Sequence, residues 1–330
     1  MTAVAALPLV APFDQLAVLV ELWMAVVGAA ADRLGVEMLS FGFMQRAFLV
    51  GICIGVMAPL IGTFLVHRQL ALIGDALAHT AFAGVAVGLF ANAVGGFGVS
   101  PYLTAVVVAM LAALLIEVIS EVTDAYNDVS MAIVLSTGFA LGTVLISINA
   151  GGLAVGVNQY LFGNLSTVSV ENAAILLALF GLIVGTVAVA YKQLLFVTFD
   201  ETAAEVAGLP VDWYNRMMVV LTALVVVGAM QIMGVILVAA MLVVPVAAAT
   251  QLARSFRSAL AWSVVLAEVA VLAGISLAYT YEATAGGVIV LVAVGVYLSA
   301  VVAAKLGIAG ATAHNESAVD PADPEPEGVE

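Results

Sequence analysis

Residues 43–66 read FMQRAFLVGICIGVMAPLIGTFLV, an apolar run in which Arg46 is the one charged side chain. Its length matches the roughly 20 residues with which a helix crosses a bilayer. Comparable runs cover 71–94, 101–120, 129–149, 171–191, 217–230, 232–250, 259–280 and 287–304. Because lipid satisfies no backbone polar group, the sequence predicts an all-α polytopic membrane helix bundle. We expect about eight or nine transmembrane helices, eight if 217–250 forms one long span.

Composition excludes a water-soluble fold. Hydrophobic residues make up 65% of the 330-residue chain and charged residues 9%, with a mean hydropathy of +1.23. So much apolar surface needs lipid as its solvent, and the runs are too long for barrel strands. The single cysteine, Cys53, lies inside an apolar run, which argues against disulfides or a thiolate cluster. We interpret Cys53, Met230, Met233 and Met241 as packing residues, and the methionines not as a copper site.

The chain divides into three parts. Residues 1–42 form an N-terminal extension, which we expect to be retained because no basic segment of a signal peptide precedes its apolar stretch. That stretch, 16–31, contains Glu21 and predicts a helix lying at the membrane interface. Residues 43–305 form the transmembrane domain. The acidic tail 306–330, which contains several prolines, is predicted to be disordered.

Charge indicates the environment and the orientation of the chain. The formal net charge of −14 disfavours nucleic acid as a partner and suits a salt-rich cytoplasm, so we expect a halophilic source. Lys and Arg near span ends favour the cytoplasm. With nine alternating spans, one side of the membrane receives Arg68, Lys192, Arg216, Arg254, Arg257 and Lys305, and the other side receives Arg33 and Arg46. The first side, and with it the C-terminal tail, is predicted to be cytoplasmic.

Glycines recur four residues apart within the predicted spans. The pairs are Gly51 with Gly55, Gly84 with Gly88, Gly138 with Gly142, and Gly181 with Gly185. Small residues at this spacing let helix backbones approach closely. We interpret all four pairs as packing faces of a compact bundle.

Asp75 and His79 are the candidate metal ligands. They stand four residues apart in LIGDALAH, residues 72–79, so a helix carries both side chains on one face. One carboxylate oxygen and one imidazole nitrogen suit zinc or manganese better than magnesium or calcium. Two ligands are few, which fits a transient site on a conduction path. The alternative is that the two side chains simply pair with each other.

Three other acids in or near the spans receive different interpretations. Glu117 and Glu121 share a helix face at the end of a span, where we expect both to be solvated. Glu268 lies within an apolar run and either lines the pathway or pairs with a polar neighbour such as Gln231.

The polar stretch between the fifth and sixth spans contains a short helix signal. Residues 199–210 read FDETAAEVAGLP, in which Gly208 and Pro210 stop the predicted helix. Its small residues would let it dock in a groove of another protein. An ordinary surface loop is the alternative.

With these residues in view, the chain resembles the integral membrane permeases of the zinc and manganese uptake branch of ABC transporters. The likeness runs from about Met44 to Val302. It is carried by MQRA from residue 44, LALIGDALAH from residue 70, LFGNL from residue 161, the FDETAAEVAGLP segment, and MLVVPVAA from residue 241. Ala78 stands where relatives often have a small hydroxyl residue.

The resemblance implies a set of roles and partners. Asp75 and His79 match the metal-coordinating pair of the family. The segment 199–210 looks like the coupling helix that touches the ATPase, with the candidate contacts Phe199, Asp200, Ala203, Ala204, Ala207, Gly208, Leu209 and Pro210. Such a permease resides in the plasma membrane as a homodimer, is served by an extracellular metal-binding protein, and is not itself an enzyme.

ATP hydrolysis is assigned to a separate subunit. Neither lysine of the chain follows a glycine, so the phosphate-binding Gly-Lys step of a P-loop is absent from the sequence. Alternative functions are a permease for iron-chelate or cobalamin cargo, a secondary metal transporter, and an intramembrane aspartyl protease. The last finds no second span with a partner aspartate.

Overall fold

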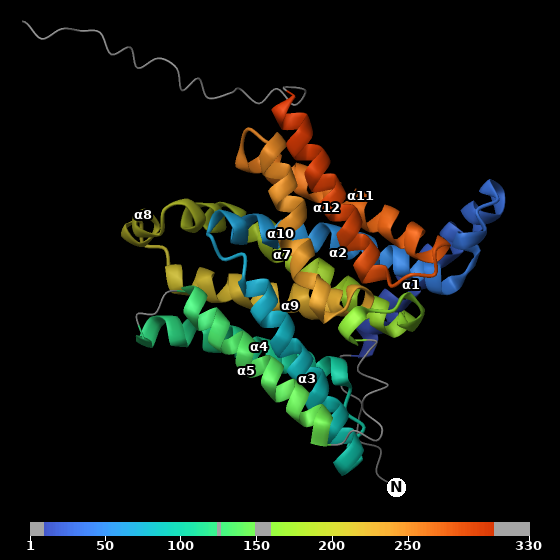
Figure 1. The fold of residues 1–330 in the computed structure, drawn as a ribbon, viewed down its shortest axis with the longest axis horizontal. Helices are drawn as coiled ribbons and strands as arrows, with labels where there is room; N and C mark the ends of the chain where they lie inside the picture. The colour runs from blue at the N-terminus through green and yellow to red at the C-terminus, as the bar shows by residue number, and fades with distance from the viewer. Residues whose placement is uncertain (1–9, 124–126, 149–159, 307–330) are drawn as a thin grey trace, which may run out of the picture.

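The structure is a computed structural model that describes residues 10–123, 127–148 and 160–306. These residues are almost entirely helical, and no strand occurs among them (Figure 1). In chain order the elements are α1 (Val10–Leu34), η1 (Glu37–Ser40), α2 (Gly42–His67), α3 (Ile73–Gly95), α4 (Pro101–Thr123), α5 (Asn127–Ile148), η2 (Leu165–Thr167), α7 (Val170–Phe199), α8 (Glu201–Val206), α9 (Val211–Met233), α10 (Val235–Leu252), α11 (Phe256–Thr280) and α12 (Ala285–Lys305). The predicted all-α class is confirmed.

Nine long helices correspond to the nine predicted spans. They are α2, α3, α4, α5, α7, α9, α10, α11 and α12, each long and apolar enough to cross a membrane. Within the described residues, α1 is a tenth helix of this kind over Gln15–Arg33. Its length and composition fit a crossing as well as an interfacial position. The interfacial assignment therefore stays a prediction.

One helix is longer than the sequence predicted, and one region that the sequence left open between one span and two contains two helices. α7 continues to Phe199 instead of ending near residue 191. Lys192 and Gln193 do not break it, because the apolar stretch LLFVTF follows with neither glycine nor proline. α9 and α10 are separate helices that meet at Gly234, whose φ of +78° ends α9. The reading of 217–250 as one span is therefore wrong.

α2 is the central helix of the bundle. It packs against α7, α9, α10 and α11, and most of its length is buried. Two glycines set its closest contacts. A Cβ on Gly51 would meet Val271 and Ile275 of α11, and a Cβ on Gly62 would overlap the backbone carbonyl of Leu242 on α10. At Gly62 the two helix backbones touch with no side chain between them.

α3, α4 and α5 form a group on one side of α2, seen together in the lower part of Figure 1. Glycines hold these helices close. A Cβ on Gly84 or Gly88 would meet residues of α4, and one on Gly138 or Gly142 of α5 would meet residues of α3. Three of the four predicted glycine pairs thus lie at helix contacts.

The fourth pair, Gly181 and Gly185, does not. Both glycines are exposed on α7, and a Cβ on either would meet nothing within 4 Å in the described part of the chain. The interpretation of this pair as a packing face within the bundle is therefore wrong. Spacing shows that two glycines share a face but not which way the face points.

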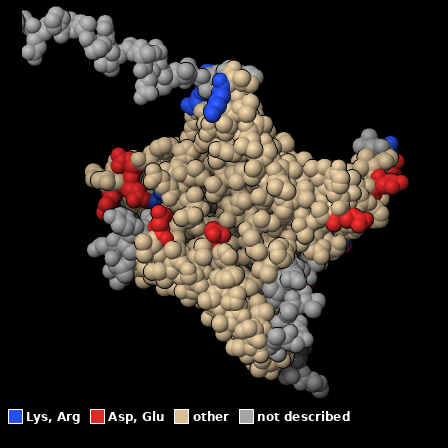
Figure 2. Space-filling view, viewed as in Figure 1, with Lys and Arg blue, Asp and Glu red and all other residues tan. Residues whose placement is uncertain are grey.

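Helix ends gather at two sides of the bundle. The side that contains α8, called the α8 end below, also holds the turn from α2 to α3, where Arg68 pairs with Glu201. Figure 2 shows acidic side chains gathered over this side, and a second group at the opposite side, of an otherwise largely uncharged surface. At the opposite end, Arg46 Nε donates to the backbone oxygen of Val168 at 2.7 Å.

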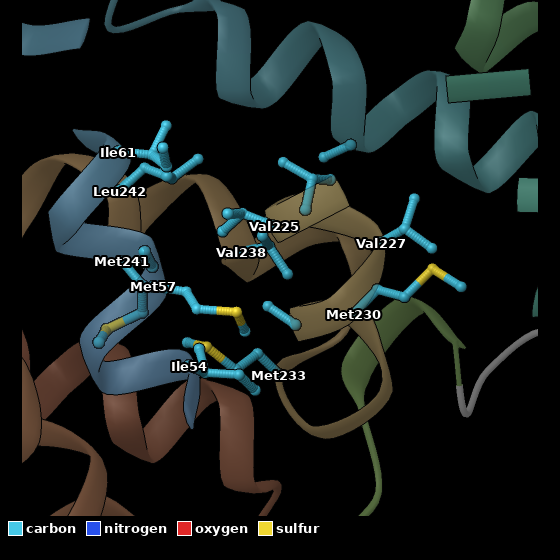
Figure 3. Close-up of a cluster of buried hydrophobic side chains, with 14 of the residues drawn as sticks. Ile54, Met57, Ile61, Val225, Val227, Met230, Met233, Val238, Met241 and Leu242 are labelled. Carbon is cyan, nitrogen blue, oxygen red and sulfur yellow. The ribbon is translucent and has the colours of Figure 1, made fainter. Parts of the chain in front are cut away.

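The methionines predicted to be packing residues lie in the core. Met230, Met233 and Met241 are at most 1% exposed. Figure 3 shows their side chains among Ile54, Val238 and other aliphatic groups of α2, α9 and α10. Unbranched thioether side chains fill such irregular spaces well, so the packing interpretation is confirmed.

The contact at Gly62 gives a prediction about stability. Gly62→Ala should lower the free energy of unfolding by about 1–3 kcal/mol, because the added methyl group must push α10 away from α2. The melting temperature of the detergent-solubilised protein measures this. Gly181→Ala is the matched control, since its methyl group enters open space on a helix, and it should not lower the melting temperature. Equal melting temperatures for both variants would contradict the role of the α2–α10 contact.

Candidate metal site

The first two turns of α3 carry the two candidate ligands. The helix begins after a tight turn in which Ile73 N donates to Leu70 O at 3.1 Å. Gly74 then lies directly against α10, where a Cβ would stand 2.7 Å from Leu242 Cδ1. This contact holds the first turn of α3 against the core. The position of Asp75 follows from it.

Asp75 and His79 face each other across one turn of helix. The distance from Asp75 Oδ1 to His79 Nε2 is 3.6 Å, which is longer than a hydrogen bond. Two ligands about 2.1 Å from a tetrahedral ion lie about 3.4 Å apart. The separation therefore suits a cation held between the oxygen and the nitrogen. The same distance also permits a direct ion pair when His79 is protonated, so both interpretations from the sequence fit this geometry.

An aromatic contact orients the imidazole. The ring of Phe139 on α5 meets the ring of His79 edge-on, with centroids 5.3 Å apart and an interplanar angle of 87°. Phe82 on α3 in turn stacks on Phe139 at 6.1 Å. The side chains of Asp75 and His79 remain 39% and 21% exposed. The pair is therefore held in place yet open on one side.

One chain supplies few ligands at this site. Within the described ranges, three or more His, Cys, Asp or Glu side chains nowhere come together in a metal-binding cluster. A bound ion would thus need further ligands from water or from another molecule.

The predicted short helix in the polar stretch exists as α8. The Asp200 side chain caps it by accepting from Ala203 N at 2.8 Å. Gly208, with φ of +83°, and Leu209, whose N donates to Ala204 O at 3.0 Å, end the helix. Pro210 then leads into α9. Each of these positions has the conformational role that its residue type favours.

The eight candidate coupling residues differ in their access to a partner. Phe199, Asp200, Ala207, Gly208 and Pro210 are exposed, and Ala203 and Leu209 are half-buried. Ala204 is fully buried, so it lies on the face of α8 that packs against the rest of the protein. It offers no surface to a partner.

Two exposed apolar residues beside α8 were not predicted from the sequence. Val206 is 85% exposed at the end of α8, and Trp213 is 64% exposed in the first turn of α9. Phe199, which precedes α8 in the chain, is 62% exposed. A tryptophan in a stretch that otherwise reads as a polar loop is the signal that could have indicated this surface. We call these three residues the α8 apolar surface.

Glu117 is not solvated as the sequence suggested. Its side chain is 13% exposed, and its Oε1 lies 3.5 Å from Arg216 Nε on α9. The ion pair joins α4 to α9 at the α8 end. The side chain of Glu121 lies outside the described residues. Helix spacing placed both acids on one face, but the arginine that covers Glu117 comes from a helix far along the chain.

Glu268 lies inside the bundle on α11. A Cβ on Gly55 of α2 would stand 2.6 Å from Glu268 Oε1, so the glycine leaves the room that the carboxylate occupies. The side chain of Gln231, the predicted polar neighbour, lies outside the described residues. Glu268 is therefore assigned to the α2–α11 contact rather than to the site on α3.

Comparison with known proteins agrees with this architecture. The model of the ABC 3 transport family matches residues 40–304, nearly the whole transmembrane domain. The chain belongs to the ABC 3 transport family. The resemblance drawn from the sequence motifs is thereby confirmed, and the protein is a multi-pass membrane permease of this family.

Individual relatives extend the comparison. A probable metal transport system membrane protein of Treponema pallidum is 36% identical over 57% of this chain and 68% of its own length. A manganese transport system membrane protein of Halalkalibacterium halodurans is 31% identical over 57% of this chain, and the match spans only 62% of that relative. Among solved structures, PsaBC from Streptococcus pneumoniae in complex with Fab has a TM-score of 0.70 at 32% identity, covering 79% of this chain and 91% of that one.

Because Ala204 is buried and Ala207 is exposed, arginine substitutions at the two positions should differ in their effect on stability. Ala204→Arg should lower the free energy of unfolding by more than about 2 kcal/mol, because a large charged side chain must enter a filled and buried position. Ala207→Arg, on the exposed face of the same helix, should leave stability within about 0.5 kcal/mol. Thermal unfolding of the solubilised permease compares the two. A stable Ala204→Arg variant would mean that α8 does not rest on the bundle at this residue.

Proposed function

We propose that the protein is the permease subunit of an ABC importer that moves divalent transition metal ions, manganese or zinc, into the cell. The observation that carries the proposal is the Asp75–His79 pair, whose oxygen and nitrogen are 3.6 Å apart, close to the spacing of about 3.4 Å between two ligands of one tetrahedral ion. The names of the relatives add support, since they are a metal transport system protein and a manganese transport system protein. Both ions accept a mixed oxygen and nitrogen set, and the name of the Halalkalibacterium halodurans relative favours manganese.

A second copy of the chain is proposed to complete the site. Each chain supplies two ligands, and the pair is partly exposed on α3. A carboxylate facing lipid is costly, whereas one that faces a cavity or a partner is stabilised. Two copies related by a two-fold axis would bring two carboxylates and two imidazoles together, which is a full tetrahedral set. The homodimer thus solves both the exposure of the pair and its shortage of ligands.

The energy source is proposed to be a separate ATPase that docks at the α8 end. The exposed residues of the coupling segment 199–210 and the α8 apolar surface lie where α7 ends, along α8, and where α9 begins. Exposed aromatic and aliphatic groups with a polar rim are typical of protein interaction sites. An extracellular metal-binding protein would then deliver the ion at the opposite end.

The orientation follows from charge. Arg68 and Arg216 lie at the α8 end in ion pairs with Glu201 and Glu117. Basic residues flank cytoplasmic span ends, so we assign the α8 end and the C-terminal tail to the cytoplasm. The protein would then lie in the plasma membrane with α8 facing the compartment that contains ATP.

The metal site has a direct test. His79→Ala should lower Mn²⁺ uptake into proteoliposomes that contain the complete complex by more than about 100-fold, since even a residue that only supports a ligand costs 10–100-fold. Asp75→Asn should be nearly as damaging, because the amide lacks the charge that offsets the lost hydration of the cation. Asp128→Asn, at the exposed start of α5, is the matched control and should transport normally. Normal uptake by the His79 variant would refute the assignment of the site.

Docking of the ATPase has a separate test. Ala207→Arg should weaken recovery of the ATPase in a pull-down, because a bulky charge on the exposed face of α8 would clash with a partner groove. Binding of Mn²⁺ to the permease should persist, since Asp75 and His79 lie on another helix. Full recovery of the ATPase would mean that this face of α8 is an ordinary surface.

A further inference from the structure

The turn that joins α2 to α3 is fastened to α8 by two adjacent residues. His67 and Arg68 end α2, and α3 begins only at Ile73. His67 contacts Phe199, just before α8, and Arg68 contacts Glu201, the first residue of α8. Figure 1 shows α8 and this turn at the same side of the bundle.

Arg68 makes the polar part of this connection. Its guanidinium pairs with Glu201 Oε1 on α8 and donates to Asn215 Oδ1 on α9 at 2.7 Å. Asn215 Nδ2 also lies 3.5 Å from Glu201 Oε1, so the three side chains form a triangle that spans three helices. The Arg68 side chain is only 9% exposed. Both interactions come from the single nitrogen Nη2, and a largely buried, planar guanidinium with charge-assisted hydrogen bonds holds a fixed geometry better than an exposed lysine ammonium would.

His67 makes the aromatic part. Its ring lies edge-on to Phe199, the last residue of α7, with centroids 6.0 Å apart, and to Phe256 of α11 at 5.0 Å. Its Nδ1 lies 2.7 Å from the backbone oxygen of Thr63. The end of α2 therefore contacts the α8 region in two ways, through the aromatic rings of His67 and Phe199 and through the Arg68 triangle. A displacement of α8 acts on α2 through both.

The connection from Arg68 to the candidate metal ligands is short and stiff. Gln69 adopts a left-handed φ of +59°, which is uncommon for a residue other than glycine. Leu70 N donates back to Leu65 O at 2.9 Å, and Asp75 N donates to Leu72 O at 3.1 Å. Such a closed turn transmits a displacement instead of absorbing it. Asp75 is the third residue of the helix that follows.

We propose that Arg68 is the positioning residue that couples movement of α8 to the Asp75–His79 pair. Through Glu201, a shift of α8 driven by the docked ATPase pulls on the turn, and the turn shifts the first turn of α3. Arg68 does not touch the ion; it acts on the ligands through the backbone. This proposal rests on the proposed function, in which α8 receives the ATPase and α3 holds the ion.

A purely structural role for Arg68 gives a different expectation. If the triangle only stabilises the α8 end, its loss lowers stability, metal binding and assembly together. If it transmits movement, its loss leaves binding and assembly intact and separates transport from ATP hydrolysis. The ratio of ions transported to ATP hydrolysed distinguishes the two roles.

The test uses the complete complex of permease, ATPase and binding protein in proteoliposomes, with Mn²⁺ as the probe. Arg68→Gln should lower the number of Mn²⁺ ions transported per ATP hydrolysed about tenfold, while Mn²⁺ binding and recovery of the ATPase stay near those of the unchanged complex. Glu201→Gln should have a similar effect. The double variant should be no worse than either single one, because both remove the same interaction. Arg68→Lys keeps the charge but loses the planar guanidinium, and it should recover part of the ratio.

Asp128→Asn is the matched control. Asp128 lies at the exposed start of α5, outside the segment 199–210 and away from Asp75 and His79 in the chain. Its ratio should be unchanged. An unchanged ratio in Arg68→Gln, or a fall accompanied by loss of Mn²⁺ binding or of the ATPase, would overturn the coupling role alone. Absence of Mn²⁺ and Zn²⁺ uptake by the unchanged complex would instead refute the proposed function, and the coupling role with it.

Discussion

The crossing of α2, α3 and α10 at Leu242 is the contact on which the site depends. The backbone oxygen of Leu242 meets Gly62 of α2, and its side chain meets Gly74 of α3. Lipid gives helices no hydrophobic reason to associate, so close backbone approach has to hold them together. At this crossing one residue of α10 sets the position of the central helix and of the helix that carries the candidate ligands. The geometry of Asp75 and His79 follows from packing that lies beside the site.

The sequence predicted most of the fold because lipid imposes a simple rule. Every span must be a helix of about 20 apolar residues, and hydropathy therefore located all nine matching helices. The sequence also predicted that Asp75 and His79 share a face, since spacing along one helix is local information. It predicted α8 for the same reason, because Asp200 and Gly208 mark the two ends of the helix within the segment itself.

What the sequence did not predict depends on contacts between distant segments. Glu117 was expected in solvent, yet Arg216 of α9 covers it. Gly181 and Gly185 have the spacing of a packing face, yet the face points away from the bundle. Ala204 was expected on the docking surface, yet it is the residue on which α8 rests. In each case helix periodicity gave the shared face, and only the fold determines what lies opposite that face.

The length of α7 has a mechanical meaning. A helix of 30 residues is about 45 Å long, whereas the hydrocarbon core of a bilayer is about 30 Å thick. Even with an ordinary tilt, α7 is longer than the hydrocarbon core is thick, so at least one of its ends lies beyond the hydrocarbon. α8 follows α7 directly, and in the proposed orientation the length of α7 holds it at the cytoplasmic surface of the membrane. The proposed ATPase would reach α8 there without entering the hydrocarbon, and the continuous helix α7 would carry a displacement of α8 into the bundle.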